Sequence, residues 1–239
     1  MKNKLIALLL SVTGTASAQT VITFDDIGLE QGSFFNGNEY SSQGVRFSVD
    51  SNGRFDQLAT YDTGETGNAD ADLEAPFSGG NLQGTFPGNA LVIADDVTDA
   101  NNDGLIDDLS DQFNGGTITV EFASSEIETV GFSLIDTPEN NRQDVTISFT
   151  GLRGSTVSTV EWDVSDLQTF DSTAAFADNF ANNFSGITAT SLGLDNIQSI
   201  DFTIESGAID SISFESVPEP SSTGLLLLGS LGCILRRRR

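Results

Sequence analysis

The chain has 239 residues, 35 of them acidic and 10 basic, with no histidine and a single cysteine. Two lysines lie within the first four residues and four arginines end the chain, so residues 19–217 carry a formal charge of −30 from 4 arginines and 34 acidic residues. This charge excludes nucleic acid and anionic lipid as partners, because both are bound through cationic side chains. Without histidine, and with one cysteine near the end, disulfides, common zinc sites and Ser-His-Asp triads are also excluded.

The first 18 residues have the three parts of a secretory signal peptide. Lys2 and Lys4 precede the apolar run LIALLL, and small residues follow at Ala16-Ser17-Ala18. We therefore expect the mature chain to begin at Gln19. The residue directly after the expected cleavage site is glutamine and not cysteine, which argues against a lipoprotein.

The mature chain opens with strand-like segments joined by a polar connection. Residues 21–26 alternate apolar and polar side chains, and residues 44–49 do the same after a segment rich in Gly, Ser and Asn. From residue 51 to 89 the periodicity fades and acidic residues gather, which is typical of a long surface loop. In an extended segment, Asp70, Asp72 and Glu74 would place three carboxylates on one face, where a cation would relieve their repulsion.

A short apolar strand expected at residues 90–94 leads to the most informative internal motif. Residues 99–108 read DANNDGLIDD, with side-chain oxygens at relative positions 1, 3, 5 and 9 and glycine at position 6. This spacing is that of the first half of an EF-hand-type calcium loop, in which alternate oxygens converge and glycine permits the turn. The expected ligands of a Ca²⁺ ion are Asp99, Asn101, Asp103, the carbonyl of Leu105, and one or more of Asp107, Asp108 and Asp111.

This loop departs from the EF-hand pattern in two ways. Ser110 stands where a bidentate glutamate is usual, and no helical periodicity flanks the loop. The loop is similar to D-x-N-x-D-G calcium loops of extracellular repeats that lack paired helices. The alternative interpretation is a hairpin connection rich in Asn and Gly that binds no ion.

Beyond residue 116 the chain carries regularly spaced short strands separated by turn residues. We expect them at residues 117–122, 130–135, 144–149, 156–164, 200–204 and 209–214. This pattern predicts an all-β sandwich or jelly roll with long acidic loops, formed as one domain by residues 19–216. Phenylalanines recur about every fourth residue between 170 and 184, which predicts one short helix or an aromatic-lined loop there.

Two further sets of residues are candidate sites. Asp25 or Asp26, at the end of the first expected strand, would be a neighbour of Asp210, in the last, if the terminal strands pair. The strand rhythm resembles carbohydrate-binding jelly-roll modules, and this resemblance implies calcium bound between the chain ends. Tyr40, Tyr61 and Trp162 are the candidates for stacking on sugar rings, although Trp162 shares a strand face with Val160 and Val164, which favours its burial.

The last 23 residues form a separate segment. A Pro218-Glu219-Pro220 hinge is followed by an apolar run at residues 224–235 and by four arginines. The run is shorter than the roughly 20 residues that span a bilayer, so it would engage the membrane only transiently. These three features in order resemble the sorting tail of PEP-CTERM proteins. The resemblance implies an exosortase as partner, removal of the tail, and a final location at the cell surface or outside the cell.

Two functions fit these observations. The first is an exported, calcium-stabilised, non-enzymatic surface or extracellular-matrix protein that binds exopolysaccharide. The second is a polysaccharide-degrading glycosidase or lyase that uses a pair of carboxylates, whose separation the sequence does not reveal. We favour the first, and expect no catalytic residues.

Overall fold

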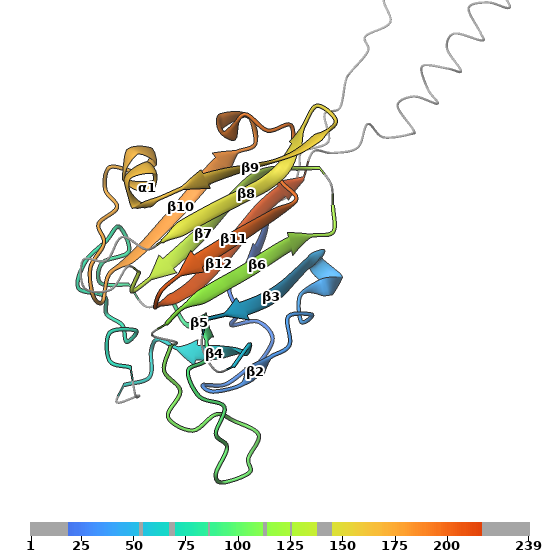
Figure 1. The fold of residues 1–239 in the computed structure, drawn as a ribbon. Coiled ribbons are helices and arrows are strands. Elements are labelled where there is room, and N and C mark those ends of the chain that lie inside the picture. Colours follow the sequence, from blue (N-terminus) through green and yellow to red (C-terminus); the bar gives the residue numbers. More distant parts are fainter. Residues whose placement is uncertain are drawn as a thin grey trace, which may run out of the picture. The chain divides into compact units, whose positions relative to one another are not determined.

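The computed structural model describes residues 19–216 except 53–54, 67–69, 86, 112–113, 125 and 138–144. The expected signal peptide at residues 1–18 and the tail, including Pro218, Glu219, Pro220 and the apolar run 224–235, lie outside these residues. The described chain folds as a β-sandwich of two antiparallel sheets (Figure 1). This confirms the all-β fold expected from the strand pattern.

The larger sheet has seven strands and contains both ends of the domain. Its order is β10-β7-β12-β5-β4-β2, and β1 pairs with β12 beside β5. The bounds are β1 Thr20–Ile22, β2 Phe34–Phe35, β4 Leu58–Asp62, β5 Asn89–Ile93, β7 Ile127–Ile135, β10 Ala181–Thr188 and β12 Ala208–Ser216. The terminal strands are therefore neighbours, with Thr20 opposite Phe214.

The second sheet has five strands in the order β3-β6-β11-β8-β9. Its strands alternate buried and accessible residues, as expected for a sheet with one face in water. The bounds are β3 Val45–Ser51, β6 Gly116–Phe122, β8 Thr146–Arg153, β9 Thr156–Trp162 and β11 Ser199–Ile204. The main core lies between the two sheets, where Phe132 of β7 contacts Phe149 and Phe202 at ring-centroid distances of 6.4 and 5.0 Å.

A second, smaller core lies on the other side of the seven-stranded sheet. There, two acidic loops pack against buried residues of β4 and β5. The first loop, between β4 and β5, contributes Leu73 and Phe77, and the second, between β5 and β6, contributes Ile106 and Leu109. The two long acidic loops are thus held on the sheet by their few apolar side chains. The carboxylates of these loops surround the apolar side chains that hold them on the sheet.

The expected strands are present with small changes in their bounds, and three further strands were not predicted. These are β2, β4 and β10; β4 is buried along most of its length and so lacks a period-two pattern. Strand β10 replaces the last four residues of the helix or loop that the sequence predicted at residues 170–184.

The helix lies earlier in the chain than predicted. Helix α1 spans Val164–Phe170, because Asp163 caps its first turn and Asp166 completes a capping box. The repeating aromatics do not share a helix, and residues 171–180 form the other predicted alternative, a loop with aromatic residues: Phe176 from this loop and Phe184 from β10 stack at 6.3 Å. No helix within the described ranges is long and apolar enough to cross a bilayer.

One glycine fixes how closely the segment before β3 approaches that strand. Gly37 has φ of +82°, and a Cβ atom there would lie 2.0 Å from the carbonyl oxygen of Phe47. We expect Gly37→Ala to destabilise the domain by more than about 2 kcal/mol, because both the left-handed backbone and the contact penalise a side chain. Gly154→Ala is the control, since Gly154 has φ of +64° but open space around it, and should cost about 1 kcal/mol. Urea denaturation midpoints measure both; equal losses would contradict the contact argument.

Candidate cation-binding sites

The 99–108 loop folds into a tight curl held by its own side chains. Asp99 accepts hydrogen bonds from the backbone N–H groups of Asp103 (3.1 Å) and Gly104 (2.9 Å), and Asn101 Oδ1 accepts a second one from Asp103 (2.9 Å). Asp107 closes the curl by accepting from the N–H of Ala100 at 2.7 Å. The alternating oxygens are therefore gathered as the spacing predicted, although backbone N–H groups already use part of their acceptor capacity.

The structure separates the residues expected to complete this loop's shell. Asp107 belongs to the curl, whereas Asp108 is exposed beside it. Asp111 is wrongly placed by the sequence argument: it is buried, bridges to Ala94, and accepts a hydrogen bond from the backbone N–H of Gly207. The chain turns inward after Leu109, and this turn carries Asp111 into a different cluster.

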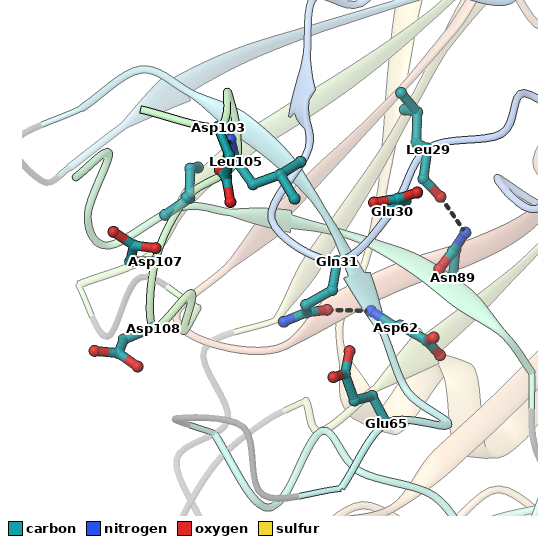
Figure 2. A pocket seen from close by; sticks show the side chains of 11 residues that line it. Leu29, Glu30, Gln31, Asp62, Glu65, Asn89, Asp103, Leu105, Asp107 and Asp108 are labelled. Atoms are coloured by element: carbon teal, nitrogen blue, oxygen red, sulfur yellow. Dashed lines mark hydrogen bonds between the residues drawn. The ribbon is translucent and has the colours of Figure 1, made fainter. Parts of the chain in front are cut away.

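The curl forms one wall of an open hollow of about 600 Å³. Figure 2 shows Asp107 and Asp108 on one side, and Asp62 and Glu65 on another. Glu30 and Asp103 also line the hollow, with Leu29, Gln31, Asn89, Leu105 and Ile106. Backbone bonding between Ile106 N–H and Gly32 C=O, at 2.8 Å, docks the loop on the sheet and sets the position of this wall. The hollow is rich in acceptors and has no basic side chain among the described residues that line it.

A second group of carboxylates, two half-buried and two buried, lies where the loops after β4 and β5 meet the seven-stranded sheet. Asp70 and Asp72 hydrogen-bond each other, and Asp70 also contacts Asp111. Ser110 donates its hydroxyl to Asp70 at 3.1 Å. The sequence argument placed the carboxylates of Asp70, Asp72 and Glu74 on one face of an extended segment, whereas the structure has a turn there, and Glu74 joins this network through its carbonyl, which accepts from Asn179.

Asp136 belongs to the same group and was missed by the sequence argument. It follows β7, is 2% exposed, and accepts a hydrogen bond from the backbone N–H of Asn179 at 2.6 Å. Burial, reinforced by the charges of Asp72, Asp111 and Asp70, raises the pKa of Asp136 to about 8. The sequence signal that could have found it is an acid directly after the mostly apolar segment VGFSLI, residues 130–135.

The remaining members of the group are also harder to ionise than free aspartates. The hydrogen bond with Asp70, together with burial, raises the pKa of Asp72 to about 6. Burial raises the pKa values of Asp70 and Asp111. The group is thus stable in the folded state when part of it is protonated or neutralised by a cation.

A third carboxylate site lies at a bulge in β12, close to where β12 pairs with β1. Asp210 is 1% exposed, and one of its oxygens, Oδ1, has no hydrogen-bond partner among the described residues. Its other oxygen accepts from the Ser211 hydroxyl at 2.8 Å. Burial raises the pKa of Asp210 to about 7, hydrogen bonds from Ser211 oppose this, and the nearby charge of Asp25 adds to it.

Asp25 is the acidic neighbour whose charge acts on Asp210. Asp25 accepts the backbone N–H of Asn89 at 2.8 Å, at the start of β5, whereas Asp26 accepts the hydroxyl of Tyr40 at 2.6 Å. The amide of Asn89 donates to the carbonyl of Leu29 at 3.2 Å (Figure 2). The sequence left Asp25 and Asp26 open as neighbours of Asp210, and Asp25 is the one whose charge contributes to the raised pKa of Asp210.

Within the described part of the chain, no group of three or more His, Cys, Asp or Glu side chains is arranged to hold a metal ion. The basic residues described there, Arg46 and Arg153, belong to the five-stranded sheet. A cation site would therefore be completed by carbonyl and amide oxygens, which Ca²⁺ accepts readily. The unpartnered oxygen of Asp210 makes the chain-end site the best prepared of the three.

The proposed sugar-stacking residues are not displayed. Tyr40 and Tyr61 are fully buried, so they were wrong candidates. Trp162 packs edge-on to Phe149 at 5.2 Å and against Phe170 at 5.4 Å, which places it inside a ladder of three rings. Phe170, 39% exposed, is the outermost ring of that ladder.

Comparison with protein families matches the end of the chain, beginning at the last residue of β12. Residues 216–239 are a PEP-CTERM protein-sorting motif. The PEP-CTERM motif confirms the interpretation of Pro218, Glu219 and Pro220 as a sorting signal. The protein is therefore exported through the membrane and is a substrate of exosortase-type sorting.

A search among curated proteins finds no match. Among solved structures, the chain is similar to TmCBM61 in complex with β-1,4-galactotriose. That similarity has 11% sequence identity and a TM-score of 0.27, and covers 77% of this chain and 94% of the other.

Proposed function

We propose that this protein is an exported, calcium-stabilised, non-enzymatic module of the cell surface or extracellular matrix. The observation that carries the proposal is the Asp210 carboxylate, which is buried at the junction of the terminal strands with one oxygen unpartnered among the described residues. A buried carboxylate without a partner is costly, and a bound cation removes that cost.

Calcium is the cation that suits the available ligands. The groups that would hold it are the carboxylates of Asp25 and Asp210 and the side-chain oxygen of Asn89, all hard oxygen donors. A bound Ca²⁺ would supply positive charge between β1, β5 and β12 and so tie the first and last strands together. The 99–108 loop is the second candidate, with Asp99, Asn101, Asp103, the Leu105 carbonyl and Asp107 as its ligands.

Exopolysaccharide is the proposed binding partner, and the hollow beside the 99–108 loop is the place for it. Its carboxylates accept hydrogen bonds from sugar hydroxyls, and its volume of about 600 Å³ accommodates sugar rings. Asp62, Glu65 and Asp107 would repel uronate or sulfate groups, so the partner is a neutral or amino-sugar polymer rather than an acidic one.

Calorimetric titration of calcium into residues 19–216, after chelator treatment, tests the metal proposal. We expect saturable binding that Asp210→Asn weakens at least tenfold, whereas Asp50→Asn, on the exposed edge strand β3, leaves it unchanged. Absence of saturable heat would refute a calcium site.

Retention on neutral and acidic polysaccharide gels tests the binding partner. We expect retention on a neutral or amino-sugar gel without release of reducing ends, and loss of retention in Asp107→Asn. Release of reducing ends would instead indicate the carboxylate-dependent enzyme.

A further inference from the structure

The five-stranded sheet ends in β9, whose outer edge is open. β9 pairs with β8 along all seven of its residues, Thr156–Trp162, and is the last strand of its sheet (Figure 1). Among the described residues, no strand or loop pairs with its other edge. Because hydrogen-bonded and non-hydrogen-bonded pairs alternate along an antiparallel ladder, every second residue of β9 points its N–H and C=O away from β8.

Other sheet edges in the described chain are covered. At the opposite end of the same sheet, the N–H of Phe47 in β3 donates to the carbonyl of Gly37 at 2.8 Å. In the larger sheet, the N–H of Leu82 donates to the carbonyl of Ala181 in β10 at 3.0 Å, and the pairing of β10 with β7 contains a register shift. Covering segments and bulges protect edge strands from pairing with other chains. β9 has an unbroken register with β8 and contains no proline, glycine or lysine.

The sequence of β9, TVSTVEW, favours strand pairing. Five of its seven residues are β-branched or aromatic, and Glu161 is its one charged residue. Val157 is 62% exposed, more than any other large apolar side chain in the described part of the chain. A straight, exposed edge of this composition is a template for an added strand.

β9 is complementary to a second copy of itself in the antiparallel direction. A twofold axis through Thr159 pairs all seven residues, with Val157 opposite Glu161 of the second copy and Thr156 opposite Trp162. No charge then faces a like charge. The two Glu161 residues are four positions apart along the strands, about 13 Å, which exceeds the Debye length of about 8 Å at physiological salt.

The same alignment brings opposite charges together at both ends of the interface. The β8–β9 turn, which follows Arg153, lies opposite the start of α1 of the second copy, where Asp163 and Asp166 form the capping box. Arg153 is exposed and is one of two basic residues in the described ranges. Asp195 also lies at the turn, but it already accepts the N–H of Gly154 at 2.5 Å. This contact offsets part of the repulsion between two acidic copies.

We propose that β9 pairs with β9 of a second copy, so that two five-stranded sheets become one continuous ten-stranded sheet. The partner is the same chain because the register that uses the whole strand also avoids like charges and places Arg153 beside an acidic helix start. A dimer carries two copies of the acidic hollow, and two binding sites on a repeating polymer raise its avidity. This consequence rests on the proposed function, whereas the dimer itself does not.

Sedimentation velocity of residues 19–216, which form one compact unit, measures the association directly. Sodium chloride at about 0.5 M reduces the Debye length to roughly 4 Å and so screens the repulsion between copies. In this buffer we expect a reversible monomer–dimer equilibrium between about 1 and 100 µM. A monomer throughout this range would overturn the proposal.

Three variants test the register. Val157→Glu places like charges opposite each other at two symmetric positions and should weaken the dimer about tenfold, whereas Val157→Lys places opposite charges there and should tighten it by a similar factor. Val157→Glu combined with Glu161→Lys exchanges the charges and should restore the parent Kd. Because misfolding does not tighten an interface, the lysine variant separates pairing from a loss of fold.

Two control variants make the same changes of net charge on β3, at the far edge of the sheet. Ser48→Glu and Asp50→Asn lie at exposed positions and should leave the Kd within about twofold of the parent value. A dimer whose Kd is unchanged by both Val157 variants has its interface elsewhere, which would overturn the proposal. A double variant that stays weak would do the same, because it contradicts the register.

Discussion

Adding calcium to the chelator-treated domain is expected to raise its melting temperature by about 5–10 °C. A ligand at a hundredfold excess over Kd stabilises the folded state by about 2.7 kcal/mol, and in a domain of this size each kcal/mol corresponds to roughly 2–4 °C. The expected source is Asp210, whose buried carboxylate would gain the partner it lacks among the described residues. Differential scanning calorimetry with and without calcium measures the increase.

The effect of Asp210→Asn on the melting temperature should differ in sign between chelator and calcium. In chelator at pH 8 the variant should melt at the same temperature as the parent or above it, because the substitution removes a buried charge that the fold disfavours. With calcium it should melt below the parent, because a ligand is gone. A residue with only a structural role would lower the melting temperature in both conditions.

Three controls locate the ion. Sodium chloride at equal ionic strength screens the −30 surface without filling a site, and should give a much smaller increase. Asp50→Asn removes one exposed charge and should keep the full calcium increment. Loss of the increment in the Asp99→Asn, Asp103→Asn double variant, with Asp210→Asn unaffected, would move the site to the 99–108 loop.

Without calcium, the domain should lose stability as the pH rises from 5 to 8.5. An aspartate whose folded pKa is raised stabilises the fold below its unfolded pKa of about 4, and this contribution is lost as the pH passes through the folded value. For Asp72, Asp210 and Asp136 the folded pKa values are about 6, 7 and 8. A folded pKa that is higher by one corresponds to about 1.4 kcal/mol of stability, so the expected decrease in melting temperature is at least about 10 °C.

Stability changes between pH 5 and 8.5 report on the titration of the buried aspartates. Residues 19–216 contain no histidine or lysine. Asp136→Asn keeps an acceptor for the Asn179 N–H and should flatten the profile between pH 6 and 8.5. Asp50→Asn should leave the profile unchanged. A parent protein equally stable at pH 5 and 8.5 in chelator would show that the buried group does not titrate in this range.

The strand pattern was readable wherever one face of a strand meets water. β6 and β11 alternate buried and accessible residues, so period-two patterning located them within one residue. β4 could not be recognised in this way because loops cover its outer face, so four of its five residues are buried. The helix was expected too late in the chain because the aromatic spacing, and not the Asp163–Asp166 capping box, was used to locate it.

The candidate sites also differ in how far the sequence could predict them. The curl of the 99–108 loop depends on local geometry, since Asp99 reaches backbone groups only four and five residues away, and its spacing alone predicted it. Asp136 and Asp111 lie in different segments and meet Asp70 only when the acidic loops fold over the sheet, so no local pattern could assemble that group.

By itself, the sequence determined the sandwich class, the acidic charge, the curl of the 99–108 loop and the sorting motif, because each depends on composition or on residues near one another in the chain. Tertiary structure alone decided which carboxylates are buried, which of them meet, and that the charge of Asp25 acts on Asp210. The physical reason is that burial and charge–charge interaction arise between segments distant in sequence, and these two effects determine which acids are hard to ionise.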